Sequence, residues 1–261
     1  MMSDAFDDQY LGCAYQMEGE MEKVLDEELK YNQFYVMWSR ATRAWASTKK
    51  DLNLPVSFKD QYGAAVVLYT METPYPIYQQ LNGNISIAGK SRDYYMDNFH
   101  FKALHFYLTR ALQELSGGCT EGITTYRGVR VTLNVFPQLR FGQFASSSRN
   151  KDTAESFGKD TFFTISTCFG VDISALSQYE VEDEVLIPVA EKFYRMDQII
   201  KTDEYTLRSS GEQCSYFNCA YLGGEKLWTP SCNSGTLLDS GSRTWLILGG
   251  LAMGLVLTLL Y

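Results

Sequence analysis

The feature that most constrains the fold is a change in residue pattern at Cys119. Before it, apolar residues recur at helical spacing among charged ones. After it, short runs rich in β-branched and aromatic residues are separated by Gly, Asn and Pro. Helices followed by strands, without alternation and without a repeat, indicate an α+β fold. We therefore expect a single α+β domain in which an N-terminal helical part packs on a two-sheet β core.

Helices are expected over residues 14–50, in two segments, and over residues 99–115, where Ser116-Gly117-Gly118 ends the pattern. An apolar run at 64–70 is stopped by Pro74 and Pro76, and its own structure stays open. A glycosylation sequon, Asn84-Ile85-Ser86, falls in a Gly/Asn-rich segment that we expect to be a loop. The expected strands lie at residues 126–129, 131–135, 141–144, 161–168, 185–189 and 192–200, and the chain beyond Gly223 is expected to be a loop.

Three short polar signatures follow one another in the strand-rich part: Tyr126-Arg127-Gly128, Ser146-Ser147-Ser148 and Glu182-Asp183-Glu184. The common dinucleotide and phosphate signals are missing, because no Gly-x-Gly-x-x-Gly follows a strand and no P-loop motif occurs. An arginine, a serine-rich strand edge and two glutamates one residue apart suit a site that holds NAD and breaks its nicotinamide–ribose bond.

Glu182 and Glu184 precede the apolar run 185–188. In an extended segment residues i and i+2 point to the same face, so both carboxylates would project together while Asp183 points away. Close carboxylates repel, so one takes up a proton or both need a cationic partner. The pair fits stabilisation of a positive transition state beside a second cation. The alternative is an acidic loop in an acidic protein.

Arg127 lies in a segment that otherwise reads as a buried strand. Burying a guanidinium is costly unless an anion meets it, and the residues leave open whether that anion is a protein carboxylate or a ligand phosphate. The serine run is compatible with a strand edge or a turn. His100 and His105 are the only histidines, and we expect both inside the helix at 99–115. At i and i+5 they do not share a face, so neither a Ser-His-Asp triad nor a histidine metal pair is expected.

Composition excludes some classes of protein. The formal net charge of −8 argues against a general nucleic-acid binder, which usually presents a basic face. The six cysteines form no Cys-x-x-Cys pair, so we expect no structural zinc site and no metal. Their even number favours disulfides and a secreted protein.

The C-terminal end predicts a membrane attachment. Residues 245–261 are almost wholly apolar and uncharged, and at 1.5 Å per residue they would span roughly 25 Å, short for a hydrocarbon core of about 30 Å. Asn233-Ser234-Gly235 and a polar spacer at 236–244 instead match the signal for a glycosylphosphatidylinositol (GPI) anchor, with a retained tail anchor as the alternative. Residues 1–10 are acidic and lack an apolar h-region, so the signal peptide that a surface protein needs is missing from this sequence.

The order of the three signatures resembles the vertebrate cell-surface arginine-specific mono-ADP-ribosyltransferases, which share an Arg–Ser–Glu-x-Glu pattern with a class of bacterial toxins. The resemblance runs from about Phe6 to the anchor signal and implies a catalytic domain at residues 6–232 followed by an anchor signal at 233–261. The segments that carry it are 6–13 (FDDQYLGC), 101–106 (FKALHF), 126–129 (YRGV), 140–144 (RFGQF) and 184–188 (EVLIP).

The resemblance implies a role for each site residue. Arg127 would contact the NAD phosphates. Gly128, the next residue, would also belong to the NAD-binding site. Ser146 would hold the ribose region of NAD. Glu184 would hydrogen-bond the nicotinamide-side ribose and stabilise its oxocarbenium character as nicotinamide leaves. Glu182 would orient an acceptor guanidinium and help to deprotonate it.

Two further residues take weaker roles from the same resemblance. Ser148, the second serine of the family's Ser-x-Ser motif, would be structural, and Phe157 would stack on nicotinamide. The family also implies two disulfides, Cys119–Cys168 and Cys13–Cys219, which leave Cys214 and Cys232 to pair by elimination.

The function implied is transfer of ADP-ribose from NAD, as co-substrate, to arginine side chains of surface or secreted proteins at the extracellular face of the plasma membrane. Two alternatives remain. One is an enzyme that mainly hydrolyses NAD, and the other is a GPI-anchored binding protein whose catalytic site has decayed.

Overall fold

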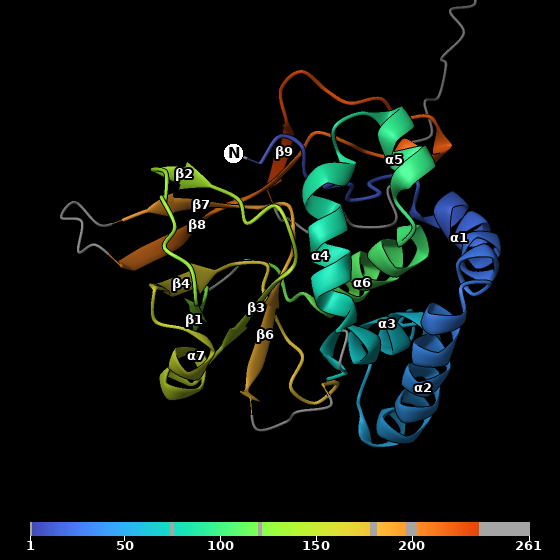
Figure 1. Cartoon of the computed structure of the whole chain (residues 1–261), viewed down its shortest axis with the longest axis horizontal. Helices are drawn as coiled ribbons and strands as arrows, with labels where there is room; N and C mark the ends of the chain where they lie inside the picture. Colours follow the sequence, from blue (N-terminus) through green and yellow to red (C-terminus); the bar gives the residue numbers. More distant parts are fainter. Residues whose placement is uncertain (1, 74–75, 120–121, 178–181, 197–202, 235–261) are drawn as a thin grey trace, which may run out of the picture.

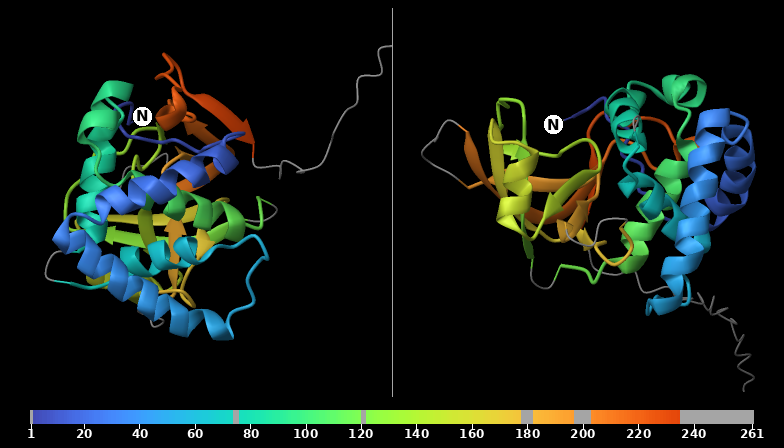
Figure 2. Two further views of the ribbon diagram at one scale, coloured as in Figure 1. Left: turned by 90° about the vertical axis from the view of Figure 1, so that its right-hand side faces the viewer. Right: turned by 60° about the horizontal axis from the view of Figure 1, so that its bottom comes forward.

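The computed structural model describes residues 2–73, 76–119, 122–177, 182–196 and 203–234. The chain forms a helical part and a sheet part that lie side by side (Figure 1), and the right-hand view of Figure 2 shows the same arrangement. The expected α+β class is confirmed. The helices of the first part are α1 (Ala14–Glu28), α2 (Asn32–Thr48), α3 (Asp60–Thr70), α4 (Ile77–Ala88), α5 (Arg92–Asn98) and α6 (Lys102–Leu115).

The apolar run at 64–70 belongs to helix α3, whose residues from Tyr62 to Tyr69 are all buried. A helix that is apolar on every side has no 3.6-residue pattern, which is why its period gave no signal. Its close packing against α2 depends on Gly63, because a Cβ there would lie 2.2 Å from the Trp45 ring. Helix α3 thus forms the centre of the helical part.

Two expectations for the helical part are wrong. Asn84 lies inside helix α4 rather than in a loop, and its Nδ2 donates to the Gln80 carbonyl at 2.9 Å. Ile77, Leu81 and Ile85 bury one face of α4, and this packing outweighs the weak helix propensity of Asn and Gly. His100 lies before α6 and not in it, so only His105 is helical.

The sheet part consists of β1 (Ile123–Val129), β2 (Gln138–Leu139), β3 (Ala145–Ser148), β4 (Thr161–Thr167), β5 (Val171–Asp172), β6 (Glu184–Ile187), β7 (Glu191–Arg195), β8 (Glu204–Ser215) and β9 (Ser231–Ser234), with helix α7 (Lys151–Phe157) after β3. The expected strands at 131–135 and 141–144 do not form. Strands β8 and β9 were not expected, and part of the strand expected at 192–200 lies outside the described residues.

The strands join in the order β2-β7-β8-β4-β1-β3-β6-β5, with β9 added to β8. All described pairings are antiparallel except β4 with β8. Strands β1 and β3 meet at one residue pair only, Tyr126 opposite Ser148. The sheet is therefore continuous in its hydrogen bonding but has two halves, where we expected two separate sheets.

The helical part packs on the β3-β6-β5 half of the sheet. Leu186 of β6 and the neighbouring Phe144 belong to the large core of the helices, whereas Ile187 and Ala145 belong to a second, smaller core with β4, β7 and β8. Successive residues of a strand point to opposite faces. Strands β3 and β6 therefore separate the two cores.

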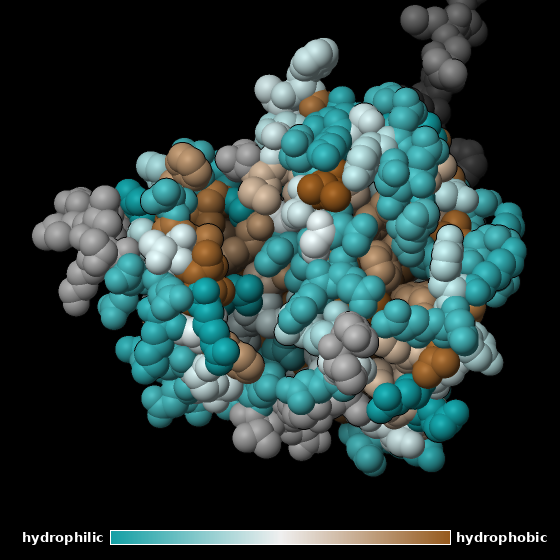
Figure 3. Space-filling model, in the orientation of Figure 1, coloured by the Kyte–Doolittle hydropathy of each residue, from teal (hydrophilic) through white to brown (hydrophobic). Residues whose placement is uncertain are grey.

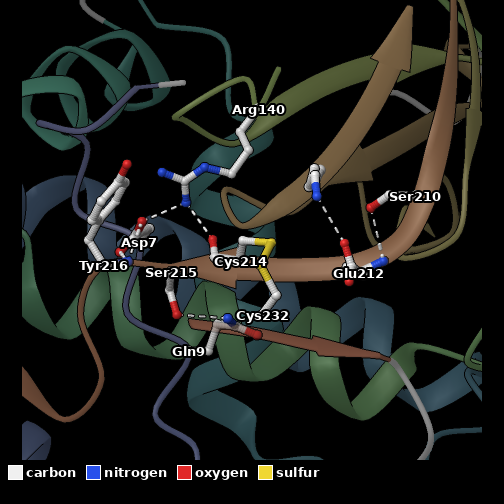
Figure 4. The surroundings of a disulfide bond; sticks show 10 residues. Asp7, Gln9, Arg140, Ser210, Glu212, Cys214, Ser215, Tyr216 and Cys232 are labelled. Carbon is white, nitrogen blue, oxygen red and sulfur yellow. Dashed lines mark hydrogen bonds and ion pairs between the residues drawn. A yellow bond between two sulfur atoms is a disulfide. The ribbon is translucent and has the colours of Figure 1, made fainter. Parts of the chain in front are cut away.

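The N-terminal segment is held against the last strands by what we call the terminal clasp, formed by Asp7, Asp8, Arg140 and the backbone of residues 216–220. Figure 4 shows the part of it in which Asp7 meets Arg140 and Tyr216. The Asp7 carboxylate accepts from the Arg140 guanidinium at 2.5 Å and from backbone N–H groups of residues 216 and 217. Asp8 accepts from the N–H groups of residues 10, 219 and 220 at 2.8–2.9 Å. Every oxygen of the two carboxylates has a donor.

All three predicted disulfides are confirmed: Cys13–Cys219, Cys119–Cys168 and Cys214–Cys232. The first joins the N-terminal segment to the clasp, and the third joins β8 to β9 (Figure 4). Strand β9 ends at Ser234. It therefore extends two residues beyond the domain boundary expected at 232. The apolar tail lies outside the described residues, and within them no helix combines the length and apolarity needed to cross a membrane.

Candidate active site

A cavity of about 1140 Å³ lies between the helical part and the sheet part. Its lining residues come from α3, α4 and α7, from β1 and β3, and from the start of β6. The face of the molecule seen in Figure 3 is largely hydrophilic, with brown residues scattered rather than gathered into one broad patch. All predicted site residues line this one cavity: Arg127, Gly128, Ser146, Ser148, Phe157, Glu182 and Glu184.

Strand pairing brings the distant signatures together. Ser148 of β3 lies opposite Glu184 of β6, and Tyr126 of β1 lies opposite Ser148 from the other side. Residues opposite each other share a face of the sheet, as do residues i and i+2. Ser146, Ser148 and Glu184 therefore point together toward the side covered by the helical part.

Arg127 is half-buried at the point where β1 and β3 diverge, and its guanidinium donates to the carbonyl of Ser146. Burial lowers the pKa of Arg127, while the charge of Glu184 opposes that shift. A guanidinium has five N–H donors in a planar fork, so most of them stay available for an anion in the cavity. The sequence left open whether the anion that meets Arg127 belongs to the protein. In the structure Glu184 is a protein carboxylate whose charge acts on Arg127, so part of the counter-charge comes from the protein.

Glu184 is buried, with 6% of its surface exposed. Burial raises its pKa to about 7, and the nearby charge of Glu182 acts in the same direction. Hydrogen bonds from Ser146 and Ser177 and the charge of Arg127 partly offset this rise. A carboxylate with so few donors is a strong electrostatic partner for any positive charge that develops in the cavity, because little of its field is screened.

Glu182 reaches the cavity by a route that differs from the one expected. Asp183 has φ 46°, in the left-handed region, so residues 182–184 are not one extended segment. A hydrogen bond from the Ser148 hydroxyl to the Glu182 carbonyl, 2.5 Å long, holds this turn. Both glutamates still line the same cavity, as expected. Burial raises the pKa of Glu182, and the charge of Glu72 adds to that rise.

Gly128 and helix α7 form the adjoining wall. A Cβ at Gly128 would lie 2.1 Å from the Gly158 carbonyl oxygen, so only glycine lets the end of α7 approach β1 this closely. The Asn150 side chain caps α7 by accepting from the N–H groups of residues 152 and 153. Phe157, the last residue of α7, is 51% exposed and lines the cavity. A flat aromatic face is thus available to a ring-shaped ligand.

The helical wall holds polar residues that the sequence did not reveal. Tyr69 of α3 is buried, and its hydroxyl donates to the Phe144 carbonyl at 3.2 Å. The Asn82 amide donates to both of these oxygens, at 3.1 and 3.0 Å. Burial raises the pKa of Tyr69 to about 12, which keeps it neutral next to Ser146 and Arg127. No local signal marks these residues, because their place depends on how α3 and α4 pack over β3.

Comparison with known proteins agrees with the geometry. The family described as NAD:arginine ADP-ribosyltransferase matches residues 1–215. Ecto-ADP-ribosyltransferase 5 of Rattus norvegicus is 44% identical over 238 residues, which cover 87% of this chain and 77% of that protein. GPI-linked NAD(P)(+)–arginine ADP-ribosyltransferase 1 of Mus musculus is 36% identical, over 95% of this chain and 82% of that protein.

Solved structures show the same fold. The crystal structure of the eucaryotic mono-ADP-ribosyltransferase ART2.2 aligns with a TM-score of 0.75 at 36% identity, covering 84% of this chain and 97% of that one. A mutant of ART2.2 in complex with NADH aligns with a TM-score of 0.76 at 35% identity, covering 85% and 97%. The match extends over both the helical part and the sheet part that enclose the cavity.

Proposed function

The chain belongs to the NAD:arginine ADP-ribosyltransferase family, and from that premise we propose that its cavity cleaves NAD and transfers ADP-ribose to an arginine side chain. One observation carries the assignment of residues: Arg127, Ser146 and Glu184, from three neighbouring strands, line one cavity together with Glu182. The cavity volume of about 1140 Å³ is large enough for a dinucleotide, because drug-sized ligands occupy about 300–1,000 Å³.

NAD is bound by residues of β1, β3 and α7. The Arg127 guanidinium contacts the phosphates, since its planar fork matches their oxygens. Ser146 holds the ribose next to nicotinamide, and the Phe157 ring stacks on the nicotinamide ring. The backbone at Gly128 lies close enough to α7 to close the end of the pocket.

Cleavage then depends on Glu184. As the bond between C1′ and the nicotinamide nitrogen breaks, nicotinamide leaves with the electron pair and positive charge develops on the ribose ring. An ionised Glu184, buried and with few donors, stabilises that charge more than it stabilises the ground state. The acceptor nitrogen forms the new bond to C1′, and its proton passes to Glu182.

The choice between transfer and hydrolysis tests the role of Glu182. With labelled NAD and an arginine analogue, the wild-type protein should form ADP-ribosyl-arginine. The Glu182→Gln variant should still release nicotinamide and free ADP-ribose but should lose the arginine product. A wild-type protein that yields only free ADP-ribose under these conditions would be a hydrolase, and the assignment of transfer would be wrong.

We also propose that the domain is displayed outside the cell on a GPI anchor. The three disulfides among the described residues suit an oxidising compartment, and a relative at 36% identity is named as GPI-linked. The acceptors would then be arginine-bearing surface or secreted proteins. Expression behind an added signal peptide, followed by phosphatidylinositol-specific phospholipase C, should release the protein from cells. Protein that stays on the membrane after this treatment would contradict the anchor.

A further inference from the structure

Glu72 lines the cavity from the helical part and has no role in the steps described so far. It follows α3 and is exposed, whereas Glu182 lies just before β6 in the sheet part. The two carboxylates therefore reach one cavity from the two different parts of the molecule. Their separation in the chain hides this relationship in the sequence.

The Glu72–Glu182 pair lacks a cation among the described residues. Burial and the charge of Glu72 both raise the pKa of Glu182, and no positive side chain offsets them. Of the two arginines that line the cavity, Arg127 donates to the Ser146 carbonyl and its charge acts on Glu184, and Arg130 donates to the Ser156 carbonyl at 3.3 Å. Neither of them offsets the rise in the pKa of Glu182. Two like charges that face one cavity without a counter-charge are unfavourable, and a cation bound between them relieves this.

A second observation on the same wall points to a ligand that donates hydrogen bonds. Asn82 is 8% exposed and lines the cavity, and its Oδ1 atom has no hydrogen-bond partner among the described residues. The Thr73 hydroxyl, next to Glu72, is likewise buried, unpartnered and part of the lining. Buried polar atoms without partners are costly and uncommon. The helical wall thus contains buried oxygen atoms that the protein itself leaves unsatisfied.

We propose that Glu72 and Glu182 hold the acceptor guanidinium between them, which makes Glu72 a specificity-determining residue for arginine. This proposal rests on the proposed function and adds a residue to it. A guanidinium presents donors along several edges, so one carboxylate can accept from one edge while Glu182 takes the proton from the attacking nitrogen. Glu72 keeps its charge throughout and contributes to binding rather than to bond cleavage.

The test measures acceptor binding apart from the chemistry. Agmatine, the guanidinium-bearing amine derived from arginine, is titrated into the full-length wild-type protein and into Glu72→Gln without NAD. Loss of one charge-assisted contact should raise the Kd for agmatine about fivefold to twentyfold. Glu22→Gln, an exposed substitution on α1 outside the cavity with the same change of charge, should leave the Kd unchanged.

Kinetics separate a binding role from a structural one. In Glu72→Gln the KM for the acceptor should rise while kcat, NAD hydrolysis and the urea midpoint of unfolding stay as in the wild type. An unchanged agmatine Kd in Glu72→Gln, or no agmatine binding by the wild type, would overturn the proposal. If agmatine binds and the variant weakens it, but no arginine product forms, the guanidinium site stands and transfer is refuted instead.

Discussion

The terminal clasp and the catalytic cavity both bury acidic side chains, but they satisfy them differently. In the clasp each oxygen of Asp7 and Asp8 accepts from a backbone N–H or from Arg140. In the cavity Glu184 has only hydroxyl donors and shares its surroundings with a second glutamate. Burial raises the pKa in both regions, to about 6 for Asp8 and about 7 for Glu184. A raised pKa alone therefore does not identify a catalytic acid.

What separates the two regions is the direction in which the carboxylate faces. The acids of the clasp face backbone from the other end of the chain, and they help to fix the N-terminal segment in place. Glu184 faces an open cavity, where the partner that would complete its charge balance is a transient one. Buried charge with complete partners stabilises a fold, whereas buried charge with an open side is available for chemistry.

The largest effect should come from breaking the clasp. Arg140→Met leaves the Asp7 carboxylate buried without its cation, so the free energy of unfolding should fall by about 3–5 kcal/mol. Urea unfolding measures this change. Arg149→Gln is the matched control, because it removes an exposed ion pair with Asp172, 3.2 Å long, and should cost at most about 1 kcal/mol. Equal losses in the two variants would refute the special role of the clasp.

A smaller effect of opposite sign is expected in the cavity. The pKa of Glu184 is about 7 in the fold, above its usual value near 4.3, so the unfolded chain ionises first and the folded state is penalised as the pH rises between these values. Glu184→Gln removes that penalty and should stabilise the protein by about 1–3 kcal/mol at pH 8, with no gain below about pH 4. Urea unfolding at both pH values tests the sign, and a destabilised variant at pH 8 would contradict it.

The smallest effect concerns the coupling between the two glutamates. The kcat/KM for NAD hydrolysis should fall as the pH drops through about 7, because Glu184 takes up a proton. Glu182→Gln removes a like charge, so this acid limb should move to lower pH. A pH profile of the variant that coincides with that of the wild type would show that Glu182 does not act on Glu184.

Local patterns predicted the parts of the fold that local forces determine. The period of α6, the β-branched residues of β4 and the apolar run of β6 each carry their own signal. Helix α4 does not, since Asn and Gly dilute its period and packing through Ile77, Leu81 and Ile85 stabilises it. In β8, Tyr205 and Leu207 alternate with exposed residues, a signal that is present but short.

The residues of the site likewise fall into those that the sequence predicted and those that it did not. Arg127, Ser146, Glu182 and Glu184 stand in three short signatures whose order could be recognised in the sequence. Glu72, Tyr69 and Asn82 stand in no signature, because only the packing of α3 and α4 over β3 brings them to the cavity. The left-handed Asp183 was also hidden, since a non-glycine residue with positive φ is set by the surrounding turn and has no sequence mark here.

The most direct test of the role of Glu184 is the rate of nicotinamide release and arginine modification from labelled NAD, compared between the wild type and Glu184→Gln. The Glu184→Gln variant should fold and bind NAD but lose about 10²–10³-fold in both rates. A Glu184→Gln protein that modifies arginine at the wild-type rate would contradict the assignment of Glu184 as the group that stabilises the developing charge.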